Sequence, residues 1–166
     1  MSDAHREATP AYIGLGSNLG EPRTQIERAF ELLDAMPDTR LAARSSLYRS
    51  APFGPVEQPD FVNAVALVLT TLGAWTLLGH LQKIERAQGR IADIRWGPRV
   101  LDLDLLVYGD RKIEEPSLTV PHTGIAKRNF VLLPLREIAP ELVIPGLGHI
   151  GEIAVREHEP RISRIE

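Results

Sequence analysis

The sequence predicts a single domain, residues 1–166, that combines α-helices with β-strands. Two segments, 22–35 and 74–88, repeat apolar residues at the spacing of one helix face. Apolar runs of strand length lie around them, at 11–15, 61–69 and 101–107. A chain of 166 residues is long enough to bury one hydrophobic core.

The overall composition excludes several classes of protein. The net charge of −3 argues against nucleic acid as a partner, because nucleic-acid binders carry an excess of Lys and Arg. The absence of cysteine excludes disulfides and thiolate metal sites and agrees with a reducing cytoplasm, where we expect the protein to work. No apolar run approaches the ~18–20 residues of a membrane span, so we expect no membrane partner. We expect residues 1–10 and 156–166 to be flexible tails.

The first strand, at 11–15, leads into a glycine-rich stretch at 16–20. This stretch matches neither the Walker phosphate loop nor the dinucleotide-binding pattern, so we interpret it as a turn from strand to helix. The helix begins near Pro22, which suits a first helical turn. Its apolar positions fall on one face; they are Ile26, Ala29, Phe30 and Leu33.

The middle of the chain predicts a strand at 41–50, a long loop at 51–60 and a strand at 61–69. The loop contains three prolines and a glycine, which suits either the wall of a binding pocket or a stiff surface loop. Asn63 is an isolated amide on an apolar strand. It needs hydrogen-bond partners, either within the protein or on the edge of a ligand.

The second helix, 74–88, ends before a basic loop at 89–99. Three arginines, two glycines and a tryptophan suit a lid that closes over an anionic ligand. Gln82 and Glu85 lie on the helix just before this loop. They are either ligand contacts or solvated side chains.

The strand at 101–107 carries two aspartates at alternate positions. Alternate side chains of a strand share a face, so Asp102 and Asp104 lie on one side and the leucines between and around them on the other. Carboxylates beside arginines suit Mg²⁺ and phosphate; the alternative is a strand edge with two solvated aspartates. Because the run continues as apolar on both faces, we expect this strand to be central in its sheet.

Beyond this strand, Gly109 and Asp110 predict a hairpin turn toward Ile113. His122 lies close in sequence to Lys127 and Arg128, where it is either a structural residue or part of a polyanion site. From residue 131 onward the apolar residues indicate packing.

Taken together, these motifs resemble the 6-hydroxymethyl-7,8-dihydropterin pyrophosphokinases of folate biosynthesis. The resemblance runs from about Tyr12 to Leu147. Its motifs occur in the family's order: 14–20 (GLGSNLG), 48–50 (YRS), 58–63 (QPDFVN), Gln82 with Glu85, Gly89 with Arg90, 95–104 (RWGPRVLDLD) and 119–122 (TVPH). The Asp-x-Asp stretch with its Trp-Gly-Pro-Arg lead is the most specific of them.

The resemblance implies an α+β fold, a ferredoxin-like α/β sandwich around a four-stranded antiparallel sheet. It implies that ATP gives its terminal pyrophosphoryl group to the pterin's hydroxymethyl oxygen and leaves as AMP. Asp102 and Asp104 would bind two Mg²⁺ ions, and Arg90 and Arg99 would stabilise charge on the phosphates. Further residues, with Arg99, match the nucleotide side of the family's site: Gln82, Glu85, Trp96, Thr119, His122 and Arg128.

For the pterin, the resemblance implies stacking between Phe61 and Phe130. Ser50 and Asn63 would pair with its polar edge, and Ala51 and Phe53 would line the pocket. The partners implied are therefore two small molecules, and we expect a monomer. Three positions depart from the family's frequent residues on the nucleotide side: Ala92, Ser117 and Thr123.

The same α/β sandwich also suits two other functions. The first is a nucleotidyl-transfer domain that uses two strand aspartates on a similar sandwich and acts on nucleic acid, which the acidic net charge argues against. The second is a ligand-binding module without catalysis, which leaves the clustered arginines and aspartates unexplained.

Overall fold

The computed structural model describes residues 7–52, 55, 57–88, 100–156 and 160–165. The major helices are α1 (Pro22–Asp34), α2 (Ala74–Ala87) and α3 (Asn129–Ile138), with single 3-10 turns at Ile125–Lys127 and Ile150–Glu152. The strands are β1 (Thr9–Ser17), β2 (Thr39–Arg44), β3 (Tyr48–Ser50), β4 (Phe61–Thr70), β5 (Asp102–Tyr108), β6 (Ile113–Glu115), β7 (Leu118–Val120), β8 (Val143–Ile144), β9 (Gly148–His149) and β10 (Ile162–Arg164). Both helices predicted from periodicity are confirmed.

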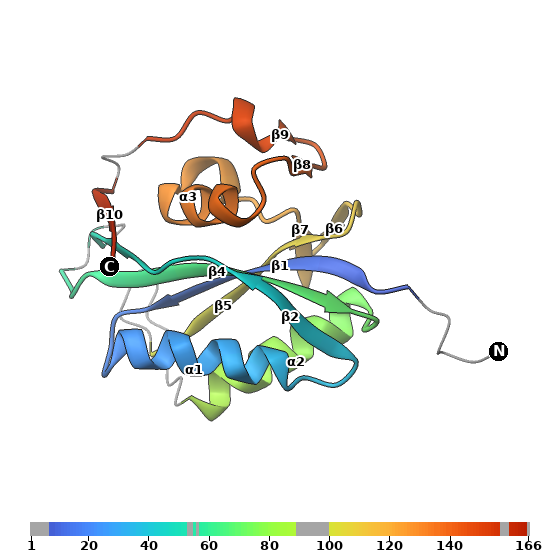
Figure 1. Ribbon diagram of the computed structural model, residues 1–166, viewed down its shortest axis with the longest axis horizontal. Helices are drawn as coiled ribbons and strands as arrows, with labels where there is room; N and C mark the ends of the chain where they lie inside the picture. The colour runs from blue at the N-terminus through green and yellow to red at the C-terminus, as the bar shows by residue number, and fades with distance from the viewer. Residues whose placement is uncertain (1–6, 53–54, 56, 89–99, 157–159, 166) are drawn as a thin grey trace.

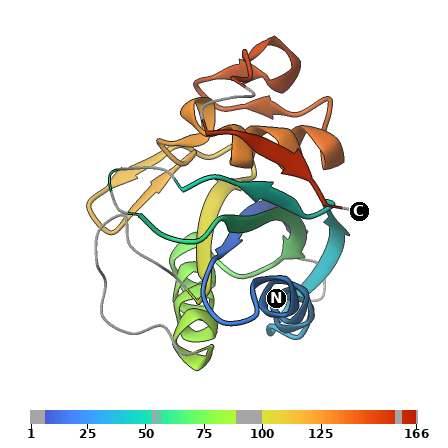
Figure 2. The ribbon, with the colours of Figure 1, turned by 90° about the vertical axis from the view of Figure 1, so that its left-hand side faces the viewer.

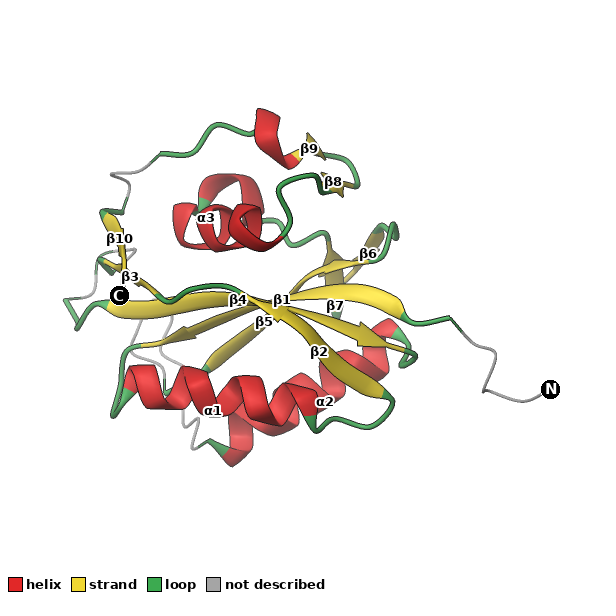
Figure 3. Ribbon diagram, viewed as in Figure 1, coloured by secondary structure: helices red, strands yellow, loops and turns green. Residues whose placement is uncertain are grey.

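The elements form three layers around one large sheet (Figure 1). Helices α1 and α2 cover one face, side by side in the second view (Figure 2), and α3 covers the other face. The colouring by element type makes the same layering plain (Figure 3). Two apolar clusters fill the spaces between the layers: one contains Ile26, Phe30, Leu77 and Leu81, and the other Leu106, Leu132 and Leu135. The helices are amphipathic because each presents only one face to the sheet.

The large sheet is antiparallel throughout, in the order β10-β3-β4-β1-β5, with β2 also paired to β4. The expectation of four strands is therefore not confirmed, because six strands pair in this sheet. Part of the difference is that the strand expected at 41–50 is broken between β2 and β3. At the break the Val65 N–H of β4 donates to the Ser45 hydroxyl at 2.9 Å. A side-chain oxygen therefore takes the place of the backbone carbonyl that would accept this N–H in a regular strand pair.

The remaining strand corrects, at residues 162–164, the expectation that residues 156–166 are a flexible tail. Residues Ile162–Arg164 form β10 and pair antiparallel with β3. The N-terminal expectation is also wrong in part, because β1 already begins at Thr9. Both ends are ordered at these points because they find backbone partners in the sheet, which a search for local patterns does not reveal.

Strand β5 follows the predicted alternation and then departs from it at a β-bulge. Leu101, Leu103 and Leu105 are buried among the residues of α1 and α2, which confirms their shared face. The pairing register shifts between Tyr12 and Ile13, which face Val107 and Leu105, so Leu106 is the extra residue. Leu106 and Val107 then both pack on the α3 side.

The expectation that β5 is a central strand is wrong, because β5 ends the order of the large sheet. The residues of β5 are apolar because helices cover both faces of the sheet there. This burial does not depend on whether the strand is central or at the edge. Its outer edge is covered by other groups: the His122 N–H donates to the Leu106 carbonyl at 2.8 Å. The predicted β5–β6 hairpin is also wrong, since β6 pairs with β7.

Candidate active site

A cavity of about 220 Å³ opens on the α3 side of the sheet. Its lining comes from β1, β4, β5, the end of β3 and the start of α3; the lining residues are Gly14, Leu15, Gly16, Ser50, Ala51, Phe61, Asn63, Ala64, Asp102, Asp104, Arg128, Phe130 and Val131. Eight of these residues were predicted from the sequence as site residues. Segments more than 100 residues apart in the chain therefore meet at one hollow.

Two predicted acidic residues form one side of this cavity. Asp102 and Asp104 are both half-buried and both line it, whereas Leu103 between them points into the opposite core. In the pairing of β1 with β5, Gly16 lies opposite Asp102 and Gly14 lies opposite Asp104. The carboxylates therefore have neighbours without side chains, which leaves space for a ligand above the sheet.

Gly14 and Gly16 line the cavity, although the sequence analysis did not single them out as site residues. Gly16 belongs to strand β1 and not to the following turn. A Cβ atom at Gly16 would lie 3.4 Å from Asn63 Oδ1, and one at Gly14 would lie 3.4 Å from the Leu106 side chain. The signal that could have revealed them is the pair of glycines at alternate positions, which share one face of a strand.

The opposite part of the cavity presents a pair of buried polar side chains. Asn63 and Ser50 are 4% and 2% exposed, and Asn63 Nδ2 donates to Ser50 Oγ at 2.7 Å. The aromatic rings of Phe61 and Phe130 line the same cavity. Ala51 adds a small apolar contact, so this part of the cavity has the flat apolar walls and polar edge that suit a heteroaromatic ring.

Arg128 brings a positive charge to the cavity. Its guanidinium carbon lies 6.0 Å from the centre of the Phe130 ring, at the outer limit of a cation–π contact. A Cβ at Gly124 would lie 2.7 Å from Arg128 Nε, so the arginine side chain lies directly against this glycine. The bare backbone at Gly124 therefore gives Arg128 its position.

The surroundings of His122 favour its neutral form. Burial lowers the pKa of His122, the Arg128 charge lowers it further, and Asp102 opposes both effects. The Gly124 N–H donates to His122 Nδ1 at 3.0 Å, which leaves Nε2 as the donor nitrogen of the neutral ring. His122 therefore feels the charges of both Arg128 and Asp102, and of these three groups Arg128 supplies the positive charge that would attract an anion.

Helix α2 contributes a buried carboxylate that contacts strand β5. Glu85 is 6% exposed, and its Oε2 accepts the backbone N–H of Leu103 at 2.8 Å. Glu85 thus holds the outer edge of β5 between the two aspartates. Gln82 lies on the exposed surface of α2, and Thr119 lies exposed on β7, where its Oγ1 is 3.4 Å from the Glu115 carbonyl. The lining residues of the cavity do not include four of the predicted site residues: Gln82, Glu85, Thr119 and His122.

Four predicted site residues lie outside the described residues: Phe53, Arg90, Trp96 and Arg99. The same holds for Ala92 and for the whole loop interpreted as a lid, residues 89–99. Of the other two departures, Ser117 Oγ accepts a hydrogen bond from Trp75 Nε1 at 2.9 Å, and Thr123 is exposed.

The donor set at β5 fits a magnesium ion that is shared with a ligand. Within the described ranges, no group of three or more His, Cys, Asp or Glu side chains could hold a metal by itself. Mg²⁺ is commonly bound through one or two carboxylates together with substrate phosphates and water. Asp102 and Asp104 supply such a pair in a cavity that is open to a ligand.

Comparisons with known proteins agree on one family. The family model described as 7,8-dihydro-6-hydroxymethylpterin-pyrophosphokinase (HPPK) matches residues 12–140. A 2-amino-4-hydroxy-6-hydroxymethyldihydropteridine pyrophosphokinase from Pseudomonas aeruginosa is 50% identical over 142 residues, which cover 86% of this chain and 88% of that protein. The protein of the same name from Haemophilus influenzae is 48% identical over 143 residues, 86% of this chain and 89% of its own length.

Two further comparisons involve longer proteins. The Schizosaccharomyces pombe folic acid synthesis protein fol1 is 40% identical over 135 residues, which cover 81% of this chain and 18% of that protein. A crystal structure of Plasmodium falciparum HPPK-DHPS with pteroate has a TM-score of 0.68 at 15% identity, and the match covers 91% of this chain and 42% of that one. This chain spans less than half of that solved chain, and the likeness shows a shared fold.

The chain belongs to the 7,8-dihydro-6-hydroxymethylpterin-pyrophosphokinase family. Its reaction is pyrophosphoryl transfer to the hydroxymethyl group of this pterin, with ATP as the co-substrate. None of the helices in the described part of the chain has the length and hydropathy that a membrane crossing requires.

Proposed function

We propose that the cavity binds the pterin at its Ser50–Asn63 end and the phosphates of Mg²⁺-ATP at its Asp102–Asp104 end. The observation that carries this proposal is that both ends belong to one cavity of about 220 Å³. The reaction then joins the hydroxymethyl oxygen to the β-phosphorus of ATP and breaks the bond from that phosphorus to the α–β bridging oxygen. AMP leaves, and the pterin diphosphate continues into folate biosynthesis.

At the pterin end, specificity comes from the buried amide and hydroxyl. Asn63 and Ser50 are hydrogen-bonded to each other. Their remaining donor and acceptor positions face the polar edge of the pterin ring. Phe61 and Phe130 stack against the flat ring, and Ala51 and Phe53 complete the pocket. A ring that lacks this polar edge would leave buried polar groups unpaired, which makes the pocket selective.

At the phosphate end, Asp102 and Asp104 would hold two Mg²⁺ ions. Bound there, these ions would neutralise phosphate charge and orient the reacting oxygens. Arg90 and Arg99 are proposed to stabilise the charge that develops on the transferred group. Arg128 and neutral His122 offer a guanidinium and an N–H donor on the nucleotide side, with Gln82, Glu85, Trp96 and Thr119 as further proposed contacts.

For Glu85 the contact with Leu103 supports an additional, indirect contribution. Its carboxylate accepts the N–H of Leu103, the residue between the two aspartates, and so fixes the part of β5 that carries them. Positioning and charge neutralisation carry most of the catalysis in phosphoryl transfer, so the hydroxyl proton can pass to water without a dedicated base.

A phosphorus NMR time course with ATP, Mg²⁺ and 6-hydroxymethyl-7,8-dihydropterin tests this function. The expected products are AMP and the pterin diphosphate, whereas ADP as the product would contradict it. Asp102→Asn and Asp104→Asn are matched in size to the native residues and should each lower kcat by at least 100-fold. Near-normal turnover in either variant would refute the metal assignment.

The proposed enzyme is a ferredoxin-like sandwich that works as a monomer. The alternation β1-α1-β2/β3-β4-α2-β5, in which β2 and β3 are two parts of one broken strand, supports a ferredoxin-like sandwich, as does the central place of β1 and β4. We propose a monomer that acts in the cytoplasm on two small molecules, since one chain supplies all of the described residues that line this cavity. Gel filtration with light scattering tests the monomer.

A further inference from the structure

The last strand of the chain lies against the wall of the proposed pterin site. Strand β10 pairs with β3, and Ile162 lies opposite Ser50 in the register. The Ala51 N–H donates to the Arg161 carbonyl at 3.0 Å. Both Ser50 and Ala51 line the cavity. The family model ends at residue 140, so this strand lies beyond the region that it matches.

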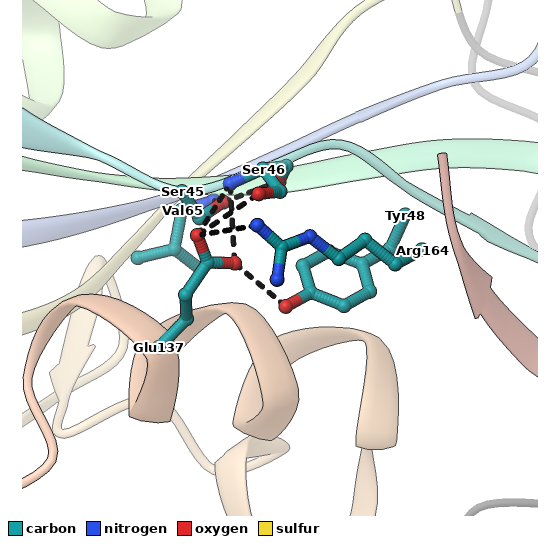
Figure 4. A network of polar contacts seen from close by, with 6 residues as sticks. All are labelled: Ser45, Ser46, Tyr48, Val65, Glu137 and Arg164. Carbon is teal, nitrogen blue, oxygen red and sulfur yellow. Dashed lines mark hydrogen bonds and ion pairs between the residues drawn. The ribbon is translucent and has the colours of Figure 1, made fainter. Parts of the chain in front are cut away.

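Helix α3 contacts the chain just before this strand and at the strand's last residue. Asn129 Nδ2 donates to the carbonyls of Arg156 and Pro160, both at 2.6 Å. At the other end of the strand, Arg164 lies 3.9 Å from the Glu137 carboxylate (Figure 4). Asn129 is directly between Arg128 and Phe130, which line the cavity. The same helix thus supports one side of the cavity and anchors the strand that supports another.

The hydrogen bonds of the β10–β3 ladder fall on alternate residues. Ala51 N–H bonds the Arg161 carbonyl, and Ile165 N–H bonds the Leu47 carbonyl at 2.8 Å. In an antiparallel pair, residues two positions apart repeat the same pattern. Ser163, which lies opposite Arg49 and midway between these bonds, therefore directs its N–H toward β3. Ile162 directs its N–H away from β3.

Without β10, strand β3 would have only β4 as a partner along its three residues. Ser50 would then stand on an unprotected edge, although its hydroxyl must meet Asn63 within the buried wall. We infer that β10 is a positioning element for pterin binding, which fixes Ser50 and Ala51 from the side opposite Asn63. This inference rests on the proposed assignment of Ser50 and Asn63 to the pterin.

The experiment compares two proline variants in the full-length chain. Ser163→Pro removes the N–H that faces β3, whereas Ile162→Pro is the matched control because its N–H faces away and proline is tolerated at the first residue of a strand. Ser163→Pro should raise the KM and the Kd for 6-hydroxymethyl-7,8-dihydropterin at least fivefold, with the KM for ATP changed less than twofold. For Ile162→Pro, the KM and Kd for the pterin and the KM for ATP should all stay within twofold of the wild-type values.

Hydrogen exchange at the Ala51 amide gives a readout that requires no ligand. Ser163→Pro should accelerate its exchange at least tenfold and Ile162→Pro less than threefold. A Ser163→Pro variant that loses thermal stability but keeps the pterin KM and Ala51 protection would overturn the inference. Equal losses for pterin and ATP would overturn it too. If Ser163→Pro does not fold, a chain that ends at Pro160 and lacks β10 undergoes the same measurements.

Failure of the proposed function would look different. A wild-type protein that releases no AMP, or does not bind this pterin, refutes that proposal. The Ala51 exchange rates would still decide whether β10 holds this wall. The two ideas can therefore fail separately.

Discussion

Removal of the Tyr48 hydroxyl tests how α3 is fastened to the sheet. Tyr48 is 8% exposed, and its hydroxyl donates to Glu137 Oε1 at 2.6 Å. The same carboxylate accepts the Ser46 N–H at 3.0 Å and the Ser46 hydroxyl at 3.0 Å, which joins the break between β2 and β3 to α3 (Figure 4). Tyr48→Phe removes one of these bonds and leaves the ring in place.

The expected magnitude follows from the charge of the acceptor. A hydrogen bond to a charged group contributes about 1.5–3 kcal/mol, and the lower end applies because the carboxylate keeps its Ser46 donors and remains partly exposed to water. Tyr48→Phe should therefore lower the free energy of unfolding by about 1.5 kcal/mol. At about 2–4 °C per kcal/mol for a chain of this size, Tm should fall by roughly 3–6 °C.

The dependence on pH provides the second part of this test. Burial raises the pKa of Glu137, but hydrogen bonds from Tyr48 and Ser46 and the Arg164 charge outweigh it, so the pKa lies below its ordinary 4.5. A depressed carboxyl pKa contributes stability that is present above 4.5 and is lost as the pH falls through the folded value. The difference between wild type and Tyr48→Phe should be constant between about pH 6 and 8 and shrink in acid.

The control is Tyr108→Phe. The Tyr108 hydroxyl donates to the neutral carbonyl of Leu72, so the cost of its removal should not depend on a carboxylate. Thermal unfolding followed by circular dichroism across this pH range measures both variants. A fall in Tm of less than 1 °C for Tyr48→Phe would refute the reasoning. So would a loss of stability in Tyr48→Phe that stays as large in acid as at neutral pH, as is expected of Tyr108→Phe.

Two further predictions address the cavity and the core. Asn63→Leu removes the donor to Ser50 and the proposed pterin contact. The KM for the pterin should therefore rise at least tenfold, while the KM for ATP stays within twofold. Steady-state kinetics with each substrate varied in turn measures both values, and an equal rise in the two KM values would contradict the prediction. Leu106→Ala truncates a side chain that is 1% exposed at the bulge of β5, which should cost about 2–5 kcal/mol in urea unfolding, and a cost below about 1 kcal/mol would show that this packing matters little.

The fold could be predicted from the sequence wherever a local pattern decides the outcome. The helices α1 and α2 follow from apolar spacing because a helix that packs on a sheet buries only one face. The shared face of Asp102 and Asp104 follows from the two-residue repeat of a strand, which the backbone imposes regardless of its neighbours. The motif resemblance predicted the family, which the comparisons confirm.

Only the tertiary structure decided which strands are neighbours and which groups meet across the chain. The apolar run of β5 indicates burial on two faces but not its place at the end of the sheet order. The sequence likewise contains no local signal that Glu85 bonds Leu103 or that β10 returns to β3. These contacts join segments far apart in the chain, so they depend on how the whole chain closes on itself. Backbone geometry at each residue cannot determine them.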